Sequence, residues 1–591
     1  MKSIGGATGT DSGRGSKGQA KRHEVRAHAL PSPPSDRDGS RWARLGIAGP
    51  RPAFEIAALV VLVAVLVVIR LHAFPMPLER DECNYAYIGA RLVEGDRMYL
   101  DQWDHQPPAI FGFYGLLGRL WGDSPSVYRS AAVAFSAASL ILVFFSVRTV
   151  ASPWAALLAA ALWATASADP GMDGDGCNRE IYMNTCAIGA MLALLLHSRR
   201  RRWWLIVLGG TALGLGSALK PILAVHWLLF LPWLLLLEWR SEGPGSRPKR
   251  VAIAATLFAL GPALIWVAHG VYFAATGRWL AFAQAVFAYN VGYTQSGDAG
   301  LISRFWHFFG TRPAANPLAA WEYRWPFRSA WALWLSGAAG FAFVGWRRPQ
   351  LPAALLRLAL VAAYLEVCLP GLFWRHYYYL MLPGLVMLTA LLADRLVAAP
   401  PDTAWAGGRA SAGRWIAAAL VVGTVVGVLD GQRRWYFGFS PDDLSGLRFG
   451  SQNLRSRDRG RQVAAAVGPD DYVYQYGSDV GIYYYGGRRC ASRFTMAYPF
   501  EDKASGYEEN RRTLIRELLE KRPRLVLVSQ EPFRELSELL RTRYRLVQTV
   551  SKTSGAPDVV VFEDPAKPTR QPDWRLEYEH LGRLIAQVLR P

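Results

Sequence analysis

LERDECNYAYIGARLVEGDRMYLDQWDHQPP, residues 78–108, follows a long apolar run, Phe54–Ile69. Acidic and basic residues stand close together in this segment, and two adjacent carboxylates, Asp81 and Glu82, lie near its start. They come where a membrane helix would leave the bilayer, and a carboxylate at that depth is costly to desolvate. The segment therefore predicts a functional site at the end of a membrane helix.

The composition indicates a membrane protein. Of 591 residues, 51% are hydrophobic and 13% aromatic, while only 19% are charged, with a net charge of +20. The basic residues gather in clusters between apolar runs, so they indicate membrane topology and not nucleic-acid binding. The five cysteines show no CxxC or zinc-ligand spacing. Cys83 and Cys177 would both face outside, either paired or as two free thiols.

Apolar runs long enough to cross a membrane, roughly 20 residues each, recur along the chain. Basic clusters such as Arg199–Arg202 and Arg347–Arg348 fall on every second connection between them. Since cytoplasmic loops carry the excess of Lys and Arg, this predicts a multi-pass protein of the cell (inner or plasma) membrane with a cytoplasmic N-terminus. About eleven spans are expected, near residues 54–72, 127–147, 151–168, 182–197, 203–219, 221–238, 251–273, 328–346, 354–373, 377–394 and 414–430.

The predicted fold class is mainly α, a polytopic membrane protein with a small C-terminal α/β extracytoplasmic domain. Residues 1–52 are rich in Gly, Ser, Pro and basic residues and are expected to form a disordered cytoplasmic tail. Near the C-terminus, β-rich strings alternate with a helical stretch, which is typical of an α/β domain. The expected parts are a transmembrane region at 53–430, its outer loops at 73–126, 169–181 and 274–328, the outer domain at 431–591, its strands at 471–477, 524–529 and 558–563, and its helix at 510–523.

Helical spacing in the first outer loop places Asp81 and Tyr85 on one face. Asp81 and Glu82 would project roughly 100° apart, so they need not do the same job. Close like charges are expected to raise the pKa of one of them towards the range useful to a base. The alternative is a loop of ordinary solvated charges.

A rigid turn, WDHQPP, closes the same loop. An aromatic ring can pack on a pyranose face while polar groups bind its hydroxyls. The turn therefore predicts sugar-binding residues, namely Trp103, Asp104 and His105.

The second outer loop, DPGMDGDGCNRE at 169–180, alternates Asp173 and Asp175 in the manner of a calcium loop. It lacks the twelve-residue EF-hand spacing, so we reject that interpretation.

Further candidates stand near the outer ends of predicted spans. Glu180 begins a span and serves either the helix dipole or the substrate. Lys220 either snorkels to the surface or binds an anionic phosphate. An aromatic belt explains Tyr378 but not an outer-side Arg375, which would suit a phosphate clamp with Lys220. His376 lies beside it.

Four strings occur in order between about residues 54 and 394: RDECNYAYIGARLVEGDRMYLDQWDHQPP, NREIYMNTCAIGAMLALLL, LGLGSALKP and RHYYYLMLPGLVML. Together they resemble the GT-C class of integral-membrane glycosyltransferases. The resemblance is strongest to the dolichyl-phosphate-mannose protein mannosyltransferases, the aminoarabinose transferases and the Rgt-type lipopolysaccharide glycosyltransferases. The first string is the specific one. The segment YVYQYGSDVGIYYYGGRRCASRF is also similar to the outer domain of some bacterial members.

The resemblance implies many membrane helices with amphipathic outer-loop helices over a cavity. It also implies a polyprenyl-phosphate sugar donor and transfer on the non-cytoplasmic side. Asp81 matches the catalytic carboxylate and Glu82 the second acid. Lys220 matches a phosphate-binding lysine, and Arg375 lies near a corresponding late position. Gln106 stands where many relatives carry Lys, which removes a positive charge near the donor headgroup.

These features predict an inverting transfer in which Asp81 is the general base. No cofactor is required, although a divalent cation near Asp81 and Glu82 is compatible with the sequence. The expected partners are the polyprenyl-phosphate sugar donor, the lipid bilayer, and a glycan, lipid or protein acceptor.

Two other classes of protein are considered. A transporter or flippase of a lipid-linked substrate is the alternative, but its ionisable residues would lie near the bilayer midplane. A structural membrane subunit leaves the acidic loop without a purpose.

Overall fold

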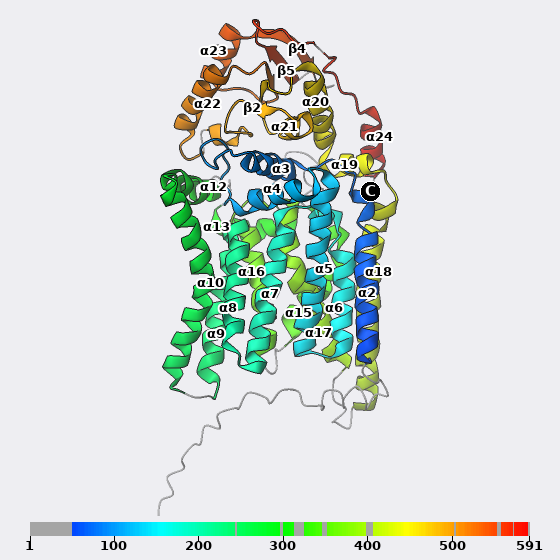
Figure 1. Cartoon of the computed structure of the whole chain (residues 1–591). Coiled ribbons are helices and arrows are strands. Elements are labelled where there is room, and N and C mark those ends of the chain that lie inside the picture. Colours follow the sequence, from blue (N-terminus) through cyan, green and yellow to red (C-terminus); the bar gives the residue numbers. More distant parts are fainter. Residues whose placement is uncertain are drawn as a thin grey trace, which may run out of the picture.

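The computed structural model describes residues 50–242, 245–295, 300–311, 324–344, 351–397, 406–501, 504–551, 557–570 and 572–588. The predicted tail at 1–52 lies almost wholly outside the described residues, as do Arg347–Arg348 and part of the predicted outer loop at 274–328. Figure 1 shows a bundle of helices with a smaller mixed layer stacked on one end. We call this end the capped end, and the smaller layer, α19 (Pro441–Phe449) to α24 (Glu579–Val588), the cap domain.

Eight helices of the described chain are long and apolar enough to cross a membrane, and three more are apolar but shorter. Each corresponds to one of the predicted apolar runs, whereas the exact number of crossings stays a prediction. The longer helices are α2 (Pro52–Val68), α5 (Pro125–Val150), α7 (Arg179–Arg200), α9 (Ala224–Arg240), α10 (Arg247–Ala275), α16 (Leu351–Cys368), α17 (Leu382–Val397) and α18 (Ala406–Phe437). The shorter ones are α6 (Pro153–Ala166), α8 (Trp203–Leu219) and α15 (Trp331–Phe343).

The two ends of the bundle differ in charge as the sequence predicts. The basic cluster Arg199–Arg202 links α7 to α8, and Arg240 and Arg247 end α9 and begin α10, all at the end away from the cap (Figure 1). The predicted outer loops lie at the capped end. Helix α18 continues to Phe437, so the predicted boundary at residue 430 falls inside this helix. Which end faces the cytoplasm stays a prediction.

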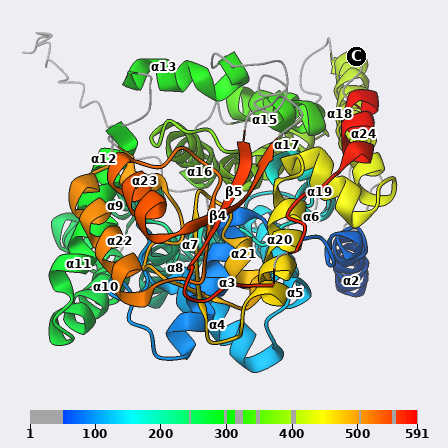
Figure 2. The same cartoon turned by 90° about the horizontal axis from the view of Figure 1, so that it is seen from above.

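Two short helices of the first outer loop, α3 (Arg80–Val93) and α4 (Ala109–Trp121), lie across the capped end (Figures 1 and 2). They pack closely because Gly89 and Gly115 meet; a Cβ on Gly89 would lie 2.6 Å from the Gly115 nitrogen. The exposed side chains of Leu116 and Trp121 on α4 suit a membrane interface. Other elements near this end are η2 (Pro170–Met172), η3 (Pro221–Leu223), α11 (Trp279–Ala283), η4 (Gln284–Ala288), α12 (Tyr289–Gln295), α13 (Leu301–Trp306), η5 (His307–Thr311) and η6 (Arg375–Met381).

The cap domain is a five-stranded sheet with helices packed around it, in the strand order β2-β1-β3-β5-β4. Strand β1 pairs parallel to β2 and β3, with Val473 opposite Leu525. Strand β5 is antiparallel to β3 and β4, with Leu525 opposite Glu563. The strands are β1 (Tyr472–Tyr476), β2 (Arg489–Cys490), β3 (Leu525–Val528), β4 (Arg545–Ser551) and β5 (Pro557–Glu563). The helices are α20 (Gln452–Ala466), α21 (Gly481–Gly486), α22 (Tyr507–Lys521) and α23 (Arg534–Arg543).

The three strands expected from β-rich strings are β1, β3 and β5, and the expected helix is α22. The sequence missed β2 and β4, which are the two edges of the sheet. Strand β2 has only two residues, and most of β4 is at least partly exposed, so neither carries a buried apolar pattern.

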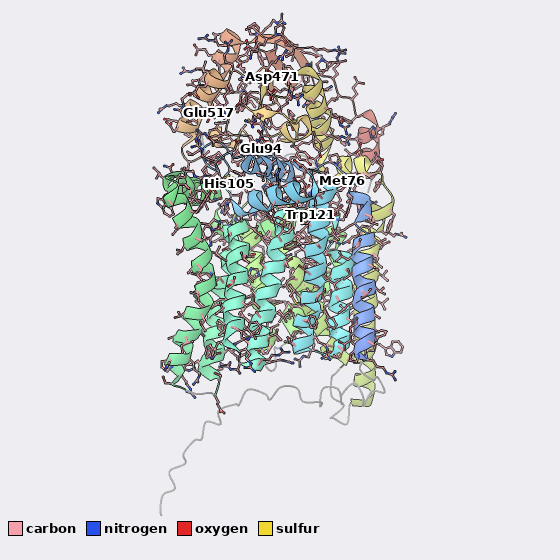
Figure 3. The ribbon with its side chains drawn as sticks, in the orientation of Figure 1. Met76, Glu94, His105, Trp121, Asp471 and Glu517 are labelled. Carbon is pink, nitrogen blue, oxygen red and sulfur yellow. The ribbon has the colours of Figure 1, made fainter. Side chains whose placement is uncertain are left out.

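The cap domain is tied to the first outer loop by main-chain contacts. The Trp103 amide donates to the Arg493 carbonyl at 2.9 Å. The Cys490 amide donates to the Tyr87 hydroxyl at 2.8 Å. Figure 3 places His105 at this junction, below Glu517 in the cap. Loop and cap therefore form one continuous wall above the bundle.

Candidate active site

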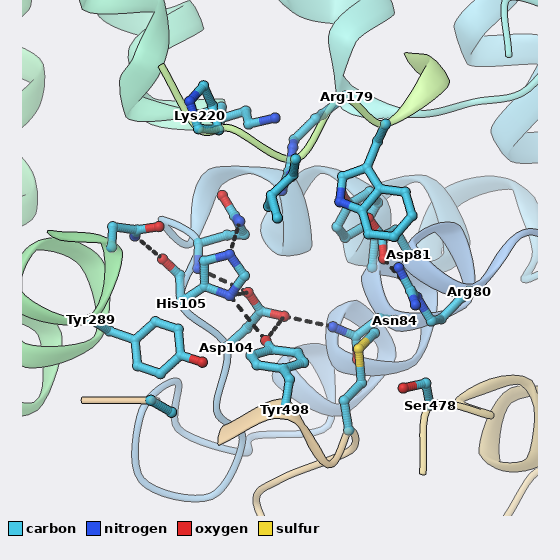
Figure 4. A pocket seen from close by; sticks show the side chains of 18 of the residues that line it. Arg80, Asp81, Asn84, Asp104, His105, Arg179, Lys220, Tyr289, Ser478 and Tyr498 are labelled. Carbon is cyan, nitrogen blue, oxygen red and sulfur yellow. Dashed lines mark hydrogen bonds and ion pairs between the residues drawn. The ribbon is translucent and has the colours of Figure 1, made fainter. Parts of the chain in front are cut away.

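A cavity of 690 Å³ lies at the junction of bundle, first outer loop and cap domain (Figure 4). This size is within the range of small-molecule sites. Of the predicted site residues, Asp81, Tyr85, Asp104, His105 and Lys220 line it. The other lining residues are Arg80, Asn84, Gln106, Arg179, Pro221, Ile222, Tyr289, Asn290, Pro370, Leu372, Trp374, Tyr377, Ser478, Met496, Tyr498, Glu501, Ala504 and Gln530.

Asp81 is in the first turn of α3, and its side chain is 21% exposed towards the cavity. Glu79 caps this helix by accepting a hydrogen bond from the Asp81 amide at 2.8 Å. Burial raises the pKa of the Asp81 carboxyl, but the nearby guanidinium groups of Arg80 and Arg179 help to outweigh this effect and hold the pKa well below its ordinary value. Asp81 is therefore an ionised acceptor at neutral pH.

Glu82 faces away from the cavity and is 2% exposed. Its carboxylate accepts from the Glu79 amide at 2.9 Å and from the Cys177 amide at 2.6 Å. Arg129 lies 3.7 Å from it. The structure thus separates the adjacent acids, because Glu82 completes the helix cap and fastens the second outer loop.

A third acid beside this pair, Glu79, has a raised pKa. Burial and then the neighbouring Asp81 charge raise the Glu79 pKa. The prediction that either Asp81 or Glu82 would carry the raised pKa does not hold for Asp81, because cations surround it.

Asp104 lines the same cavity as Asp81 and follows it in the first outer loop. Its carboxylate accepts from Asn84 Nδ2 at 2.7 Å and from the Gln106 amide at 2.9 Å. The Tyr498 hydroxyl of the cap domain approaches it at 3.4 Å. Burial raises the pKa of Asp104 to about 6, although these hydrogen bonds act in the opposite direction.

His105 bridges the loop and the cap. Its Nδ1 lies 3.0 Å from the Tyr498 hydroxyl, and its ring is 5.5 Å from that of Tyr289. Burial, and then the charge of Arg179, lower the pKa of His105 to about 3, so the ring is neutral. Trp103 does not line the cavity; it packs on Phe494 and supports the turn from behind.

The cations of the cavity come from the ends of the helical bundle. Lys220 follows α8, and its Nζ lies 3.0 Å from Glu180 Oε1 and 3.6 Å from the Tyr377 ring centre. Burial lowers the pKa of Lys220 to about 8, which leaves it mainly charged at neutral pH. Glu180 is 1% exposed and holds Lys220 rather than lining the cavity. Arg179, beside it, lines the cavity and lies over the Tyr85 ring at 5.6 Å.

Three predicted candidates lie elsewhere. Arg375 is 3.4 Å from Asp173 and stacks on Trp325, so it does not join Lys220 in a clamp. His376 is buried and lies 3.9 Å from Asp173. The Tyr378 hydroxyl donates to the Phe308 carbonyl at 2.8 Å. All three fasten the capped end and do not line the cavity.

Arginine side chains pair with the carboxylates of the second outer loop. Arg448 of α19 lies 2.8 Å from Asp173 and 2.5 Å from Asp175. These carboxylates therefore face counter-charges and not a ligand. Cys83 and Cys177 are both buried free thiols.

Sequence reasoning missed Arg179 and Tyr498. Arg179 stands within the quoted string NREIYMN, where an arginine at the outer start of a span breaks the charge rule as Arg375 does. Tyr498 carries no signal in the sequence, because only the fold of the cap brings it to the first loop.

Among the described residues, no group of three or more His, Cys, Asp or Glu is arranged to hold a metal ion.

Comparison with known proteins bears on the fold that carries this cavity. A family model described as dolichyl-phosphate-mannose-protein mannosyltransferase matches residues 105–266. No curated protein sequence matches the chain. Among solved structures, the chain is similar to ArnT from Cupriavidus metallidurans bound to undecaprenyl phosphate, with 16% identity, a TM-score of 0.55, and coverage of 88% of this chain and 99% of that one.

A second similar structure is the oligosaccharyltransferase of Archaeoglobus fulgidus tethered with an acceptor peptide. It has 13% identity and a TM-score of 0.50, and the match covers 90% of this chain and 75% of that one. At these identities the likeness concerns the fold. The chain is a multi-pass membrane protein with the fold of the GT-C glycosyltransferases, as the resemblance in its sequence predicts.

Proposed function

We propose that this protein is a glycosyltransferase that moves a sugar from a polyprenyl-phosphate donor to an acceptor hydroxyl, with inversion at the anomeric carbon. The single observation that carries the proposal is that an ionised carboxylate, Asp81, and a buried ammonium, Lys220, line one cavity at the end of a GT-C bundle. That ArnT from Cupriavidus metallidurans binds undecaprenyl phosphate supports the choice of donor.

The two charges suit the two halves of a single displacement. The acceptor oxygen forms a bond to the anomeric carbon while the bond from that carbon to the phosphate oxygen breaks. The hydroxyl proton passes to Asp81, whose low pKa keeps it ready to accept the hydrogen bond before transfer. The departing lipid phosphate gains negative charge, which Lys220 and Arg179 stabilise.

The residues around these groups act by holding them. Glu180 fixes the Lys220 ammonium at 3.0 Å, and Arg80 lies 3.3 Å from the Asp81 carboxylate. Such pre-positioned charges need little rearrangement as the reaction proceeds. A divalent cation beside Asp81 is compatible with this arrangement but is not needed by it.

We further propose that the cavity faces the non-cytoplasmic side, with residues 53–430 as the membrane-embedded transferase region and 431–591 as its extracytoplasmic part. The basic clusters at the uncapped end favour this orientation. A cysteine introduced at Glu94, whose side chain is 51% exposed at the capped end, provides the test. A membrane-impermeant maleimide added to intact cells should label it, and labelling only after lysis would contradict the orientation.

The activity is tested with the purified full-length chain and undecaprenyl-phosphate-linked sugars. We expect release of free undecaprenyl phosphate and appearance of the sugar on an added acceptor or on water. Movement of intact lipid-linked sugar across vesicles without cleavage would favour a flippase instead. Tight binding of undecaprenyl phosphate with neither cleavage nor movement would contradict both.

A further inference from the structure

The cavity has two unlike walls. Lys220 and Arg179 belong to the helical bundle, whereas Ser478, Tyr498 and Gln530 belong to the cap domain. Figure 4 shows Ser478 and Tyr498 on the side opposite Lys220 and Arg179, with Asp81 to one side between them. The cationic wall suits a lipid phosphate, so the second substrate must approach from the cap wall.

The cap wall is fixed in place by its contacts with the first outer loop. Thr495 Oγ1 donates to Asn84 Oδ1 at 2.7 Å, and the Thr495 carbonyl accepts from Gln475 Nε2 at 2.8 Å. Three residues further on, the Tyr498 hydroxyl lies 3.0 Å from His105 Nδ1. A wall held on both sides in this way is a pre-formed binding surface, which lowers the cost of ordering a ligand.

The chemistry of this wall favours an uncharged, hydroxyl-rich ligand. Its described residues offer a hydroxyl, an amide, an aromatic ring and one carboxylate, Glu501, and none of those lining the cavity is Lys or Arg. A phosphorylated lipid headgroup would find no Lys or Arg among the described cap residues that line the cavity. Aromatic faces with amide and hydroxyl groups instead fit the apolar face and the hydroxyls of a sugar.

A peptide fits less well. Extended peptides commonly add to the exposed edge of a sheet through main-chain hydrogen bonds. The edge strands of the cap sheet are β2 and β4, and no residue of either lines the cavity.

We infer that the cap wall is the acceptor subsite and that the acceptor is an uncharged carbohydrate, which binds against Gln530 and the neighbouring rings of Tyr498 and Tyr289. This inference rests on the proposed function, because it assigns the second substrate of that reaction. It gives the cap domain a direct role in choosing the acceptor.

The test measures binding of the acceptor without any donor. The full-length chain in detergent is titrated with neutral oligosaccharides of glucose, mannose, galactose or arabinose, with a serine- and threonine-containing peptide, and with a phosphorylated disaccharide lipid, and binding is followed by saturation-transfer NMR. Gln530→Ala removes a side chain from an exposed position and should not disturb folding. Tyr498→Leu removes the ring. Tyr472→Phe, in β1 and away from the cavity, is the matched control.

We expect at least one neutral oligosaccharide to bind, and each cavity variant to weaken that binding about tenfold, as the loss of one hydrogen bond or ring contact typically does. Tyr472→Phe should bind as the unaltered chain does. Binding of the peptide or the phospholipid alone, equal binding by Gln530→Ala and the control, or binding of none of the probes would overturn the inference. Undecaprenyl phosphate binding, measured on the same samples, distinguishes this failure from failure of the proposed function.

Discussion

Two acidic clusters at the capped end look alike in the sequence but differ in the structure. The carboxylates of the first cluster, Asp81 and Asp104, line an open cavity, whereas those of the second, Asp173 and Asp175, are buried against Arg448. The difference lies in what covers the carboxylates, since Asp173 and Asp175 are enclosed by the protein against Arg448, whereas Asp81 and Asp104 reach the cavity. An acidic cluster is therefore a candidate site where its carboxylates still reach an open cavity, as Asp81 does beside Arg80.

The largest effect is expected from Asp81→Asn, which keeps the shape and removes the base. We expect transfer to fall roughly 10²–10⁴-fold, the usual contribution of a general base. The rate is measured as sugar transferred per unit of folded protein. Asp101→Asn, an acid of the same loop that pairs with Arg97 at the surface, is the matched control and should retain the rate. Full activity of Asp81→Asn would remove the first cluster from the chemistry.

Arg448→Met tests the second cluster. It leaves Asp173 and Asp175 buried without their main counter-charge, which typically costs about 3–5 kcal/mol of stability. We expect a lower midpoint of thermal unfolding, measured in detergent by intrinsic fluorescence. Arg461→Met, whose side chain is 68% exposed, should change it little. Two outcomes would show that the second cluster is not structural. One is an unchanged midpoint for Arg448→Met, and the other is that this variant keeps its stability but no longer cleaves the donor.

Glu82→Gln distinguishes the two clusters within a single turn of helix. Glu82 accepts from two buried amides and faces no cavity, so it behaves like the second cluster although it adjoins Asp81. Weakening these charge-assisted bonds should cost roughly 1–3 kcal/mol of stability. Donor cleavage per folded molecule should stay close to that of the unaltered chain. A large loss of turnover at unchanged stability would return Glu82 to the catalytic pair.

The difference between Asp81 and Glu82 also shows which features of the site can be predicted from the sequence and which cannot. Apolar runs and the charge rule predict the helices and their relative ends, because each depends on local composition. Of the site residues predicted from the first-loop string, Asp81, Tyr85, Asp104 and His105 line one cavity, whereas Glu82 and Trp103 do not. These features are local in the chain.

What the sequence does not predict depends on contacts between distant segments. Arg375 was expected beside Lys220, but Asp173 binds it, and only the packing of the second loop decides between these partners. Tyr498 reaches Asp104 and His105 across almost four hundred residues of chain through the fold of the cap. Neither a hydrophobic period nor a short sequence motif predicts such contacts between distant segments.

The smallest effect expected concerns pH and separates the two acids of the open cluster. Burial raises the pKa of Asp104 to about 6, whereas cations keep Asp81 ionised far below that pH. Below pH 6 Asp104 gains a proton and no longer accepts fully from Asn84 and the Gln106 amide, so the turn that carries His105 loosens. Transfer measured as kcat/KM should therefore fall about tenfold in one step centred near pH 6 as the pH is lowered, and stay constant on either side of that step.

In Asp104→Asn the same profile should lose its step near pH 6 at a constant, lower rate, because the amide does not titrate. A step that persists in Asp104→Asn and vanishes in Asp81→Asn would mean that Asp81 carries the raised pKa. The cations around Asp81 would then not keep it ionised. Asp81 and Asp104 would no longer differ in the way proposed, with the pKa of Asp81 lowered and that of Asp104 raised. Each variant replaces one carboxylate oxygen with an amide nitrogen, so the comparison isolates the loss of one negative charge at each position.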